Sequence, residues 1–230
     1  MIGIICAMEI EAAQYKAAIQ AEKTERISGM EFVSGKLYGK DTVVTVCGVG
    51  KVFAAMCAQT MLLCFSPDIV LNTGVAGTLT DRLGVCDIAI ADEVAQYDMD
   101  TSPLGDPVGM ISGINKIKLP ADARIVSALC RSVELLDGRR FEVGTIASGD
   151  QFINSLERKR FIREQFGAIA CEMEGAAIGQ VCFINGIPFG TLRAISDSTG
   201  ENSHMEYGVF LKEAAENSCR VLEHFQMVWN

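Results

Sequence analysis

Acidic side chains occupy positions where predicted strands end. Glu172 and Glu174 follow a short apolar run that begins at Ile169, and the residues from Glu174 to Cys182 are typical of a helix. Residues two apart on an extended strand share one face, so the two carboxylates could point the same way. Asp197 ends a second apolar run in the same manner. In open α/β sheets, ligands bind at the carboxyl ends of strands.

A third acidic pair, Glu9 and Glu11, follows the first predicted strand. Burying a carboxylate among apolar neighbours is costly unless another group pairs with it. Negative charge is also favourable where a helix starts. Helix capping is therefore the favoured interpretation of Glu172, but not of Glu174. Acidic groups at several strand ends predict one polar cleft.

Length, composition and charge limit the classes of function. The chain has 230 residues, of which 49% are hydrophobic, and this is ample for one substantial buried core. Its formal net charge is −9 and its isoelectric point is about 4.8. Nucleic-acid binding requires a basic surface, so this charge argues against it. The same charge is compatible with a small-molecule substrate.

Cysteine and histidine usage argues against a metal site and against export. The chain has nine cysteines, without a Cys-x-x-Cys pair, and most lie in apolar runs where a free thiol packs as a small core residue. Its two histidines, His204 and His224, are not paired, so we expect no zinc site. No apolar run is long enough to span a membrane, and the N-terminus is typical of a strand rather than a signal peptide. We therefore predict a reducing, cytoplasmic setting.

Strands and helices alternate along the chain, which predicts a single α/β domain over residues 1–230. We expect a central, twisted, mixed but mostly parallel sheet with helices on both faces. The predicted strands before residue 100 are Ile2–Ala7, Phe32–Tyr38, Thr42–Cys47, Ile69–Asn72 and Asp87–Ala91, and the later ones are Glu142–Ala147, the run at Ile169 and Pro188–Ile195. The predicted helices are Met8–Glu22, Val52–Phe65, Ala121–Leu136, Ser155–Phe166, the segment after Glu174 and Glu206–Val228.

Three segments between these elements bear on function. Gly48–Gly50 is interpreted as a tight strand-to-helix turn, although close backbone approach to a ligand remains possible. Asn72–Gly77 is predicted as a second glycine-bearing loop. Tyr97–Pro120 lacks periodicity and is the best candidate for a long functional loop. In the helix that follows Ser155, we expect Glu157, Arg158 and Lys159 to be solvated.

Six motifs occur in order along the chain and resemble those of the 5′-methylthioadenosine/S-adenosylhomocysteine nucleosidases, within the purine-nucleoside-phosphorylase-like superfamily. They are Ile5-Cys-Ala-Met-Glu-Ile-Glu11, Gly48-Val-Gly-Lys51, Asn72-Thr-Gly-Val-Ala-Gly77, Ser148-Gly-Asp-Gln-Phe-Ile153, Glu172-Met-Glu174 and Arg193-Ala-Ile-Ser-Asp197. The resemblance covers nearly the whole chain. It implies a homodimer that needs no metal or cofactor and hydrolyses the N-glycosidic bond of 5′-thio-substituted adenine nucleosides.

The resemblance also implies a role for each site residue. Asp197 would protonate the departing adenine near N7, Glu11 would deprotonate the attacking water, and Glu174 would hold the ribose hydroxyls. Burial can raise the pKa of a carboxylic acid enough for such a donor role. The supporting positions would be Met173 on the ribose, Phe152 and Ile153 on adenine, Ser196 beside the acid, Arg193 beside the water, and Glu172.

The resemblance further implies that Met8, Val49, Thr101, Leu104 and Tyr207 would surround the 5′ substituent. This chain departs from the family at two places. Val75 stands where a serine usually lies near the catalytic water. Thr101–Asp106 replaces a more aromatic stretch, so the preferred 5′ substituent is open.

Three alternatives remain. A nucleoside phosphorylase would need cationic or amide partners for phosphate, whereas the N-terminal motif offers Glu9 and Glu11. An aminofutalosine-type nucleosidase would share the same motifs. A non-catalytic purine-binding module would gain nothing from burying three carboxylates. Hydrolysis of a small-molecule adenine nucleoside is therefore the main hypothesis.

Overall fold

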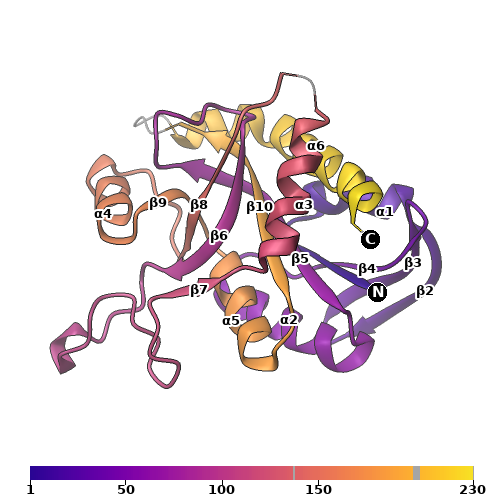
Figure 1. Cartoon of the computed structure of the whole chain (residues 1–230), viewed down its shortest axis with the longest axis horizontal. Helices are drawn as coiled ribbons and strands as arrows, with labels where there is room; N and C mark the ends of the chain where they lie inside the picture. Colours follow the sequence, from indigo (N-terminus) through magenta and orange to yellow (C-terminus); the bar gives the residue numbers. More distant parts are fainter. Residues whose placement is uncertain (137, 199–202, 230) are drawn as a thin grey trace.

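The chain folds around one mixed sheet, which contains ten strands in the described part of the molecule (Figure 1). The structure is a computed structural model that describes residues 1–136, 138–198 and 203–229. The first strands are β1 (Ile2–Cys6), β2 (Gln20–Ile27), β3 (Met30–Leu37), β4 (Lys40–Val46) and β5 (Ile69–Thr78). The later strands are β6 (Ile88–Gln96), β7 (Lys118–Pro120), β8 (Phe141–Ser148), β9 (Ala168–Glu172) and β10 (Phe189–Asp197).

Half of this sheet closes on itself. The strand order is β10-β6-β8-β9-β5-β1-β4-β3-β2, and β10 also pairs with β5, so β5, β10, β6, β8 and β9 form a ring. Parallel pairs join β1 to β4 and β5, β10 to β5, and β8 to β6 and β9. Antiparallel pairs join β5 to β9, β6 to β10 and β7, and β3 to β2 and β4. The predicted single α/β fold with a mixed sheet is confirmed, whereas the sheet is less parallel than expected.

Helices cover both faces of the sheet, as predicted (Figure 1). Helices α1 (Glu9–Ala18), α3 (Ala123–Glu134) and α6 (Ser203–Val228) pack together on one face, and α2 (Lys51–Phe65) and α5 (Gly175–Asn185) pack together on the other. Helix α4 (Leu156–Phe166) lies against β8 and β9. The buried apolar residues form corresponding clusters, one under α1, α3 and α6 and another under α2 and α5.

The first helix is shorter than predicted. It ends at Ala18, and residues 20–27, whose first three were assigned to that helix, form strand β2. The sequence Gln-Ala-Glu-Lys-Thr-Glu-Arg-Ile has no apolar stripe, because β2 is an edge strand that is mostly exposed. Charged side chains are common on such edges because they discourage pairing with other chains. Strand β2 was not predicted, because most of its side chains face solvent and its sequence therefore lacks an apolar pattern.

Strand β5 continues through the segment that was predicted as a glycine-bearing loop. Residues 72–77 pair with β10 on one side, and Gly77 pairs with Cys171 of β9 on the other. The glycines leave space for carboxylates. A Cβ atom on Gly74 would lie 2.3 Å from Glu11 Oε1, and one on Gly77 would lie 2.8 Å from Asp197 Oδ2. The glycines thus reflect close side-chain approach, not a turn.

The segment between β6 and α3 is mostly irregular, as predicted, and projects from the body of the molecule (Figure 1). It includes a single 3₁₀ turn, η1 (Ser102–Leu104), and ends in the short strand β7. Among the described helices, none is both long and apolar enough to cross a membrane.

Candidate active site

One pocket lies at the end of the sheet where β1, β8, β9 and β10 terminate. Its lining includes the predicted site residues except Arg193, which lies buried beside it, and Thr101 and Leu104. The lining residues are Ala7, Met8, Glu11, Val49, Val75, Ala76, Gly77, Gln151, Phe152, Ile153, Cys171, Glu172, Met173, Glu174, Ser196, Asp197 and Tyr207. Residues from separate motifs of the chain therefore meet in one place.

Glu11 lies at the start of α1, directly after β1, and is 3% exposed. Its Oε2 accepts hydrogen bonds from the backbone N–H groups of Ala7 and Met8, each at 2.9 Å, and Oε1 accepts one from Val75 N–H at 3.0 Å. Burial raises the pKa of Glu11, while the Arg193 guanidinium and these backbone donors act in the opposite direction. Val75 thus holds the Glu11 carboxylate through its backbone N–H group. This contact does not need the serine side chain that is usual in the family.

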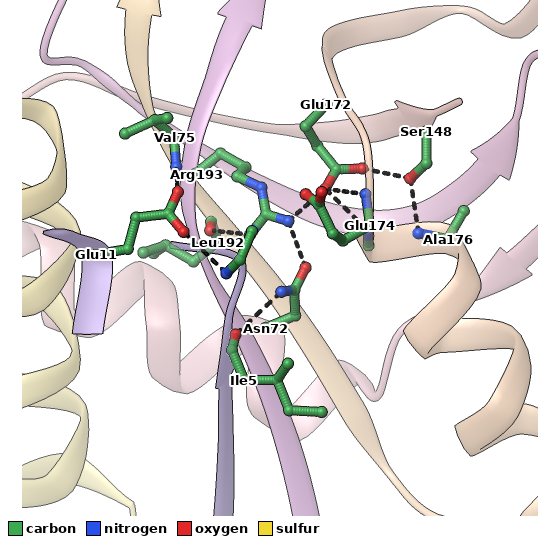
Figure 2. A network of polar contacts seen from close by, with 12 residues as sticks. Ile5, Glu11, Asn72, Val75, Ser148, Glu172, Glu174, Ala176, Leu192 and Arg193 are labelled. Carbon is green, nitrogen blue, oxygen red and sulfur yellow. Dashed lines mark hydrogen bonds and ion pairs between the residues drawn. The ribbon is translucent and has the colours of Figure 1, made fainter. Parts of the chain in front are cut away.

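Glu172 and Arg193 form a buried ion pair at the centre of a polar network (Figure 2). Glu172 Oε2 also accepts hydrogen bonds from Glu174 N–H at 3.0 Å and Gly175 N–H at 2.8 Å. These are donors at the start of α5, so the capping interpretation of Glu172 is confirmed. Arg193 donates in addition to Asn72, and Ser148 donates to Glu172.

Glu174 has fewer partners than Glu172. Its Oε1 accepts a hydrogen bond of 2.8 Å from Gly50 N–H, and it is 5% exposed. Burial and the neighbouring Glu172 carboxylate raise the pKa of Glu174 to about 8, against the opposing effect of Arg193. Gly50 has a φ of 102°, so the predicted tight turn before α2 is confirmed, and its amide approaches a carboxylate.

Asp197 ends β10 and is 3% exposed. Ser196 Oγ donates to its Oδ1 over 2.9 Å, and Lys159 Nζ lies 3.8 Å from its Oδ2. The expectation that Lys159 is solvated is wrong, because this residue of α4 is only 4% exposed. Spacing alone could not reveal this, since the neighbouring charges Arg158 and Arg160 make the whole run resemble a surface.

Aromatic and thioether groups form another part of the pocket wall. The rings of Phe152 and Tyr207 meet edge to face, with centroids 5.5 Å apart, and Tyr207 Oη donates to Met8 Sδ over 3.3 Å. Phe152 and Val49 line the pocket yet are about half exposed, at 49% and 50%. They form its mouth.

The pocket differs from the prediction at a few positions. Thr101 and Leu104 lie on or beside η1 and do not line the pocket. Leu104 is 84% exposed. Sequence reasoning assigned no individual role to Ala7, Ala76, Gly77, Gln151 or Cys171, which do line the pocket. All of them except Cys171 stand in the motifs quoted above, which was a usable signal. Among the described residues, no group of His, Cys, Asp and Glu could hold a metal ion.

Chemically, this arrangement suits acid–base catalysis on a ligand with both apolar and polar parts. Carboxyl groups from α1, β10 and the start of α5 reach the pocket, and none of the described lining residues is lysine or arginine. Carboxyl groups in different surroundings can divide the roles of acid and base between them.

Comparisons with known proteins agree with this geometry. Residues 1–226 match the family model described as "Phosphorylase superfamily". A 5′-methylthioadenosine/S-adenosylhomocysteine nucleosidase of Geobacillus thermodenitrificans (strain NG80-2) is 40% identical over 221 residues, which are 96% of this chain and 93% of that protein.

Two solved structures share the fold. The nucleosidase of the same name from Neisseria meningitidis, in complex with methylthio-immucillin-A, has a TM-score of 0.94 and 34% identity, covering 98% of this chain and 97% of that one. The futalosine hydrolase of Helicobacter pylori strain 26695 has a TM-score of 0.93 and 32% identity, with the same coverage. By sequence and fold together, the chain belongs to the phosphorylase superfamily and, within it, to the 5′-methylthioadenosine/S-adenosylhomocysteine nucleosidase family.

Proposed function

We propose that this protein hydrolyses the N-glycosidic bond of 5′-methylthioadenosine, S-adenosylhomocysteine and related 5′-substituted adenine nucleosides, releasing adenine. The observation that carries the proposal is the meeting of Glu11, Glu174 and Asp197 in one pocket that also has an apolar, aromatic wall. The Geobacillus relative, which is 40% identical in sequence and is named for these two substrates, supports the same substrate class.

Breaking this bond leaves negative charge on the purine and positive charge on the ribose. Asp197 donates a proton to purine N7, and Ser196 orients its carboxyl group through the hydrogen bond to Oδ1. Phe152 stacks on adenine, and the Ile153 backbone binds its edge. A positioned general acid of this kind typically contributes about 10²–10⁴-fold in rate.

The water attacks from the side of Glu11. The backbone donors around Glu11 aim its carboxyl group into the pocket. The buried Glu172–Arg193 pair supports the water beside it. Glu174 holds the ribose hydroxyls and faces the positive charge that develops on the sugar, while Met173 packs on the ribose. Met8, Val49, Val75 and Tyr207 surround the 5′ substituent.

Water, and not phosphate, is the nucleophile. Arg193 is buried and already paired with Glu172, and the described lining residues include no cation. Phosphate placed beside Glu11 would be repelled. The test is turnover of 5′-methylthioadenosine in phosphate-free buffer, which should give adenine and free 5′-methylthioribose. Obligate dependence on phosphate, with a sugar 1-phosphate product, would show a phosphorylase. Tight binding of adenosine without turnover would show a binding module.

A second candidate function is hydrolysis of an aminofutalosine-type adenine nucleoside. The similarity to a futalosine hydrolase structure, with a TM-score of 0.93, specifically favours it. Comparison of kcat/KM for 5′-methylthioadenosine and for the aminofutalosine substrate distinguishes the two. Inosine and uridine should not be cleaved by either activity.

The protein acts as a homodimer in this proposal. Exposed apolar side chains occur on α2 and on α5, which pack together, and they include Val52, Phe53, Met56, Leu63, Phe183 and Ile184. Helix α2 begins two residues after Val49 at the pocket mouth, so a second copy on this face would lie near the pocket.

The cellular setting is a reducing cytoplasm, where the products enter nucleoside catabolism and methionine salvage. Nine free thiols support this setting, because such thiols persist where the environment is reducing. The reaction itself uses only carboxyl groups and water, so no cofactor is required.

A further inference from the structure

Lys159 places a positive charge inside the protein. It lies in the first part of α4, where its backbone N–H donates to Ser155 O over 2.9 Å, and it is 4% exposed. Removing an ammonium group from water is costly unless charged or polar partners compensate. The partners of this lysine therefore indicate what its burial achieves.

The ammonium group reaches the end of β10. Lys159 Nζ lies 3.8 Å from Asp197 Oδ2 and donates to Ser198 O over 2.6 Å. The side chains of Lys159 and Asp197 are each 4% exposed, so water screens their attraction little. The lysine thus contacts the proposed leaving-group acid itself and the residue that follows it.

Titratable groups from three helices or strands face Asp197. Besides Lys159 of α4, they include the Cys171 thiol of β9 and the Tyr207 phenol of α6. Burial and, to a smaller extent, the Asp197 carboxylate raise the pKa of Cys171 to about 12, while Lys159 acts in the opposite direction. Burial also raises the pKa of Tyr207, with smaller contributions from Glu11, Glu174 and Asp197. Among these three groups, Lys159 supplies the positive charge.

We propose that Lys159 is a positioning residue for the leaving-group acid, holding the Asp197 carboxyl group in place and stabilising the carboxylate that forms when its proton leaves. This inference rests on the proposed function. In the step concerned, the proton of Asp197 moves to purine N7 and the C1′–N9 bonding electrons move onto the purine. Asp197 becomes a carboxylate beside the ammonium, and Lys159 keeps its own protons throughout.

The pH profile of kcat/KM tests this role. Because the acid must be protonated, activity falls at alkaline pH. An opposite charge within 4–6 Å typically shifts a carboxyl pKa by about 1–3 units. Lys159→Met should therefore move the alkaline limb upward by about one pH unit or more. It should also lower the plateau kcat on the order of 10-fold, because a weaker acid transfers its proton less readily.

Two further variants separate charge from structure. Lys159→Gln can still donate a hydrogen bond to Ser198 O but carries no charge, so its alkaline limb should move as it does in Lys159→Met. Lys159→Arg keeps the charge, so its limb should stay at the wild-type position. Arg160→Met removes an exposed cation from the same helix and should not move the profile.

A substrate with an activated leaving group completes the test. A p-nitrophenyl riboside needs no proton from Asp197, so Lys159→Met and Lys159→Gln should cleave it at the wild-type rate. An unchanged alkaline limb in Lys159→Gln would overturn the inference, as would equal losses on both substrates. Wild-type protein that releases no adenine would instead overturn the proposed function. If Lys159→Met does not fold, the Gln and Arg variants still decide the question.

Discussion

At the residue scale, neighbouring carboxyl groups have very different surroundings. Glu172 accepts hydrogen bonds from Ser148, Glu174 N–H and Gly175 N–H and forms an ion pair with Arg193. Glu174, two residues later, accepts one from Gly50 N–H, and its pKa is raised to about 8. Such differences allow carboxyl groups in one pocket to play different parts at the same pH.

Asp197 and Glu174 should be separable by leaving group. Asp197→Asn keeps the size of the side chain but removes its proton, so kcat should fall by about 10²–10⁴-fold. Glu174→Gln cannot ionise to face the positive charge that develops on the ribose, and it should also lower kcat. With a p-nitrophenyl riboside, Asp197→Asn should recover much of its rate, while Glu174→Gln should not. Equal impairment of both variants on both substrates would contradict these roles.

The pKa of Glu174 also makes stability depend on pH. Its pKa in the folded protein is about 8, above its ordinary value of 4.5. The folded state therefore binds this proton more tightly, and the stability it contributes is lost as pH rises from about 4.5 to 8. Glu174→Gln cannot ionise. Its Tm minus that of the wild type should increase between pH 5 and pH 8, on the order of 5 °C.

Differential scanning calorimetry at several pH values measures this difference. Glu11, whose pKa is also raised, is present in both proteins, so its titration occurs in both. A Tm difference that stays constant across this range would show that Glu174 is ionised throughout.

At the element scale, β5 brings the site together. It lies beside β1, β9 and β10, and the carboxylates of Glu11 and Asp197 lie against its glycines. The Val75 backbone of the same strand supports Glu11. If residues other than glycine stood at positions 74 and 77, their Cβ atoms would clash with the two carboxylates at these distances.

Gly77→Ala tests this arrangement. The new methyl group would lie 2.8 Å from Asp197 Oδ2, so the acid must move. We expect a loss of kcat on the adenine substrate that exceeds any loss on a p-nitrophenyl riboside. Gly208→Ala is a suitable control, because a Cβ there meets no atom within 4 Å. It should keep full activity and stabilise α6 by about 0.5–1 kcal/mol. Full activity in Gly77→Ala would show that the Asp197 carboxyl group can move away from β5 and still protonate the substrate, which would contradict this arrangement.

At the scale of the whole molecule, the exposed apolar side chains of α2 and α5 bear on assembly. Val52 and Ile184 are 78% and 63% exposed, although this chain buries most of its large apolar residues. Large exposed apolar patches commonly mark sites of association between proteins. The half-exposed pocket residue Val49 lies just before α2, so this apolar surface starts near the pocket mouth.

Val52→Glu combined with Ile184→Glu should shift the proposed dimer to monomer, because charges would be buried at its interface. Size-exclusion chromatography with light scattering measures the shift. Leu135→Glu, at an exposed apolar position after α3, should leave the dimer intact. A wild-type protein that is monomeric at micromolar concentration would contradict the homodimer.

The amino-acid sequence by itself determined the fold class, most of the strands and helices, and the set of motifs that would meet. Periodicity and glycine placement are local properties, and the ends of parallel strands gather at one edge of a sheet. This is why residues such as Glu11, Glu174 and Asp197 could be assigned to one cleft before their positions were known.

Only the tertiary structure decided the features that depend on contacts between distant segments. Pairing between strands decides three of these features, and no local pattern encodes it. They are the five-stranded ring that the β5–β10 pair closes, the edge strand β2, and the extension of β5 through Gly77. Lys159 is the clearest case, because its neighbours in sequence are charged. Its burial beside Asp197 arises from the docking of α4 against β8 and β9, and that packing changes an ordinary surface charge into a partner of the acid.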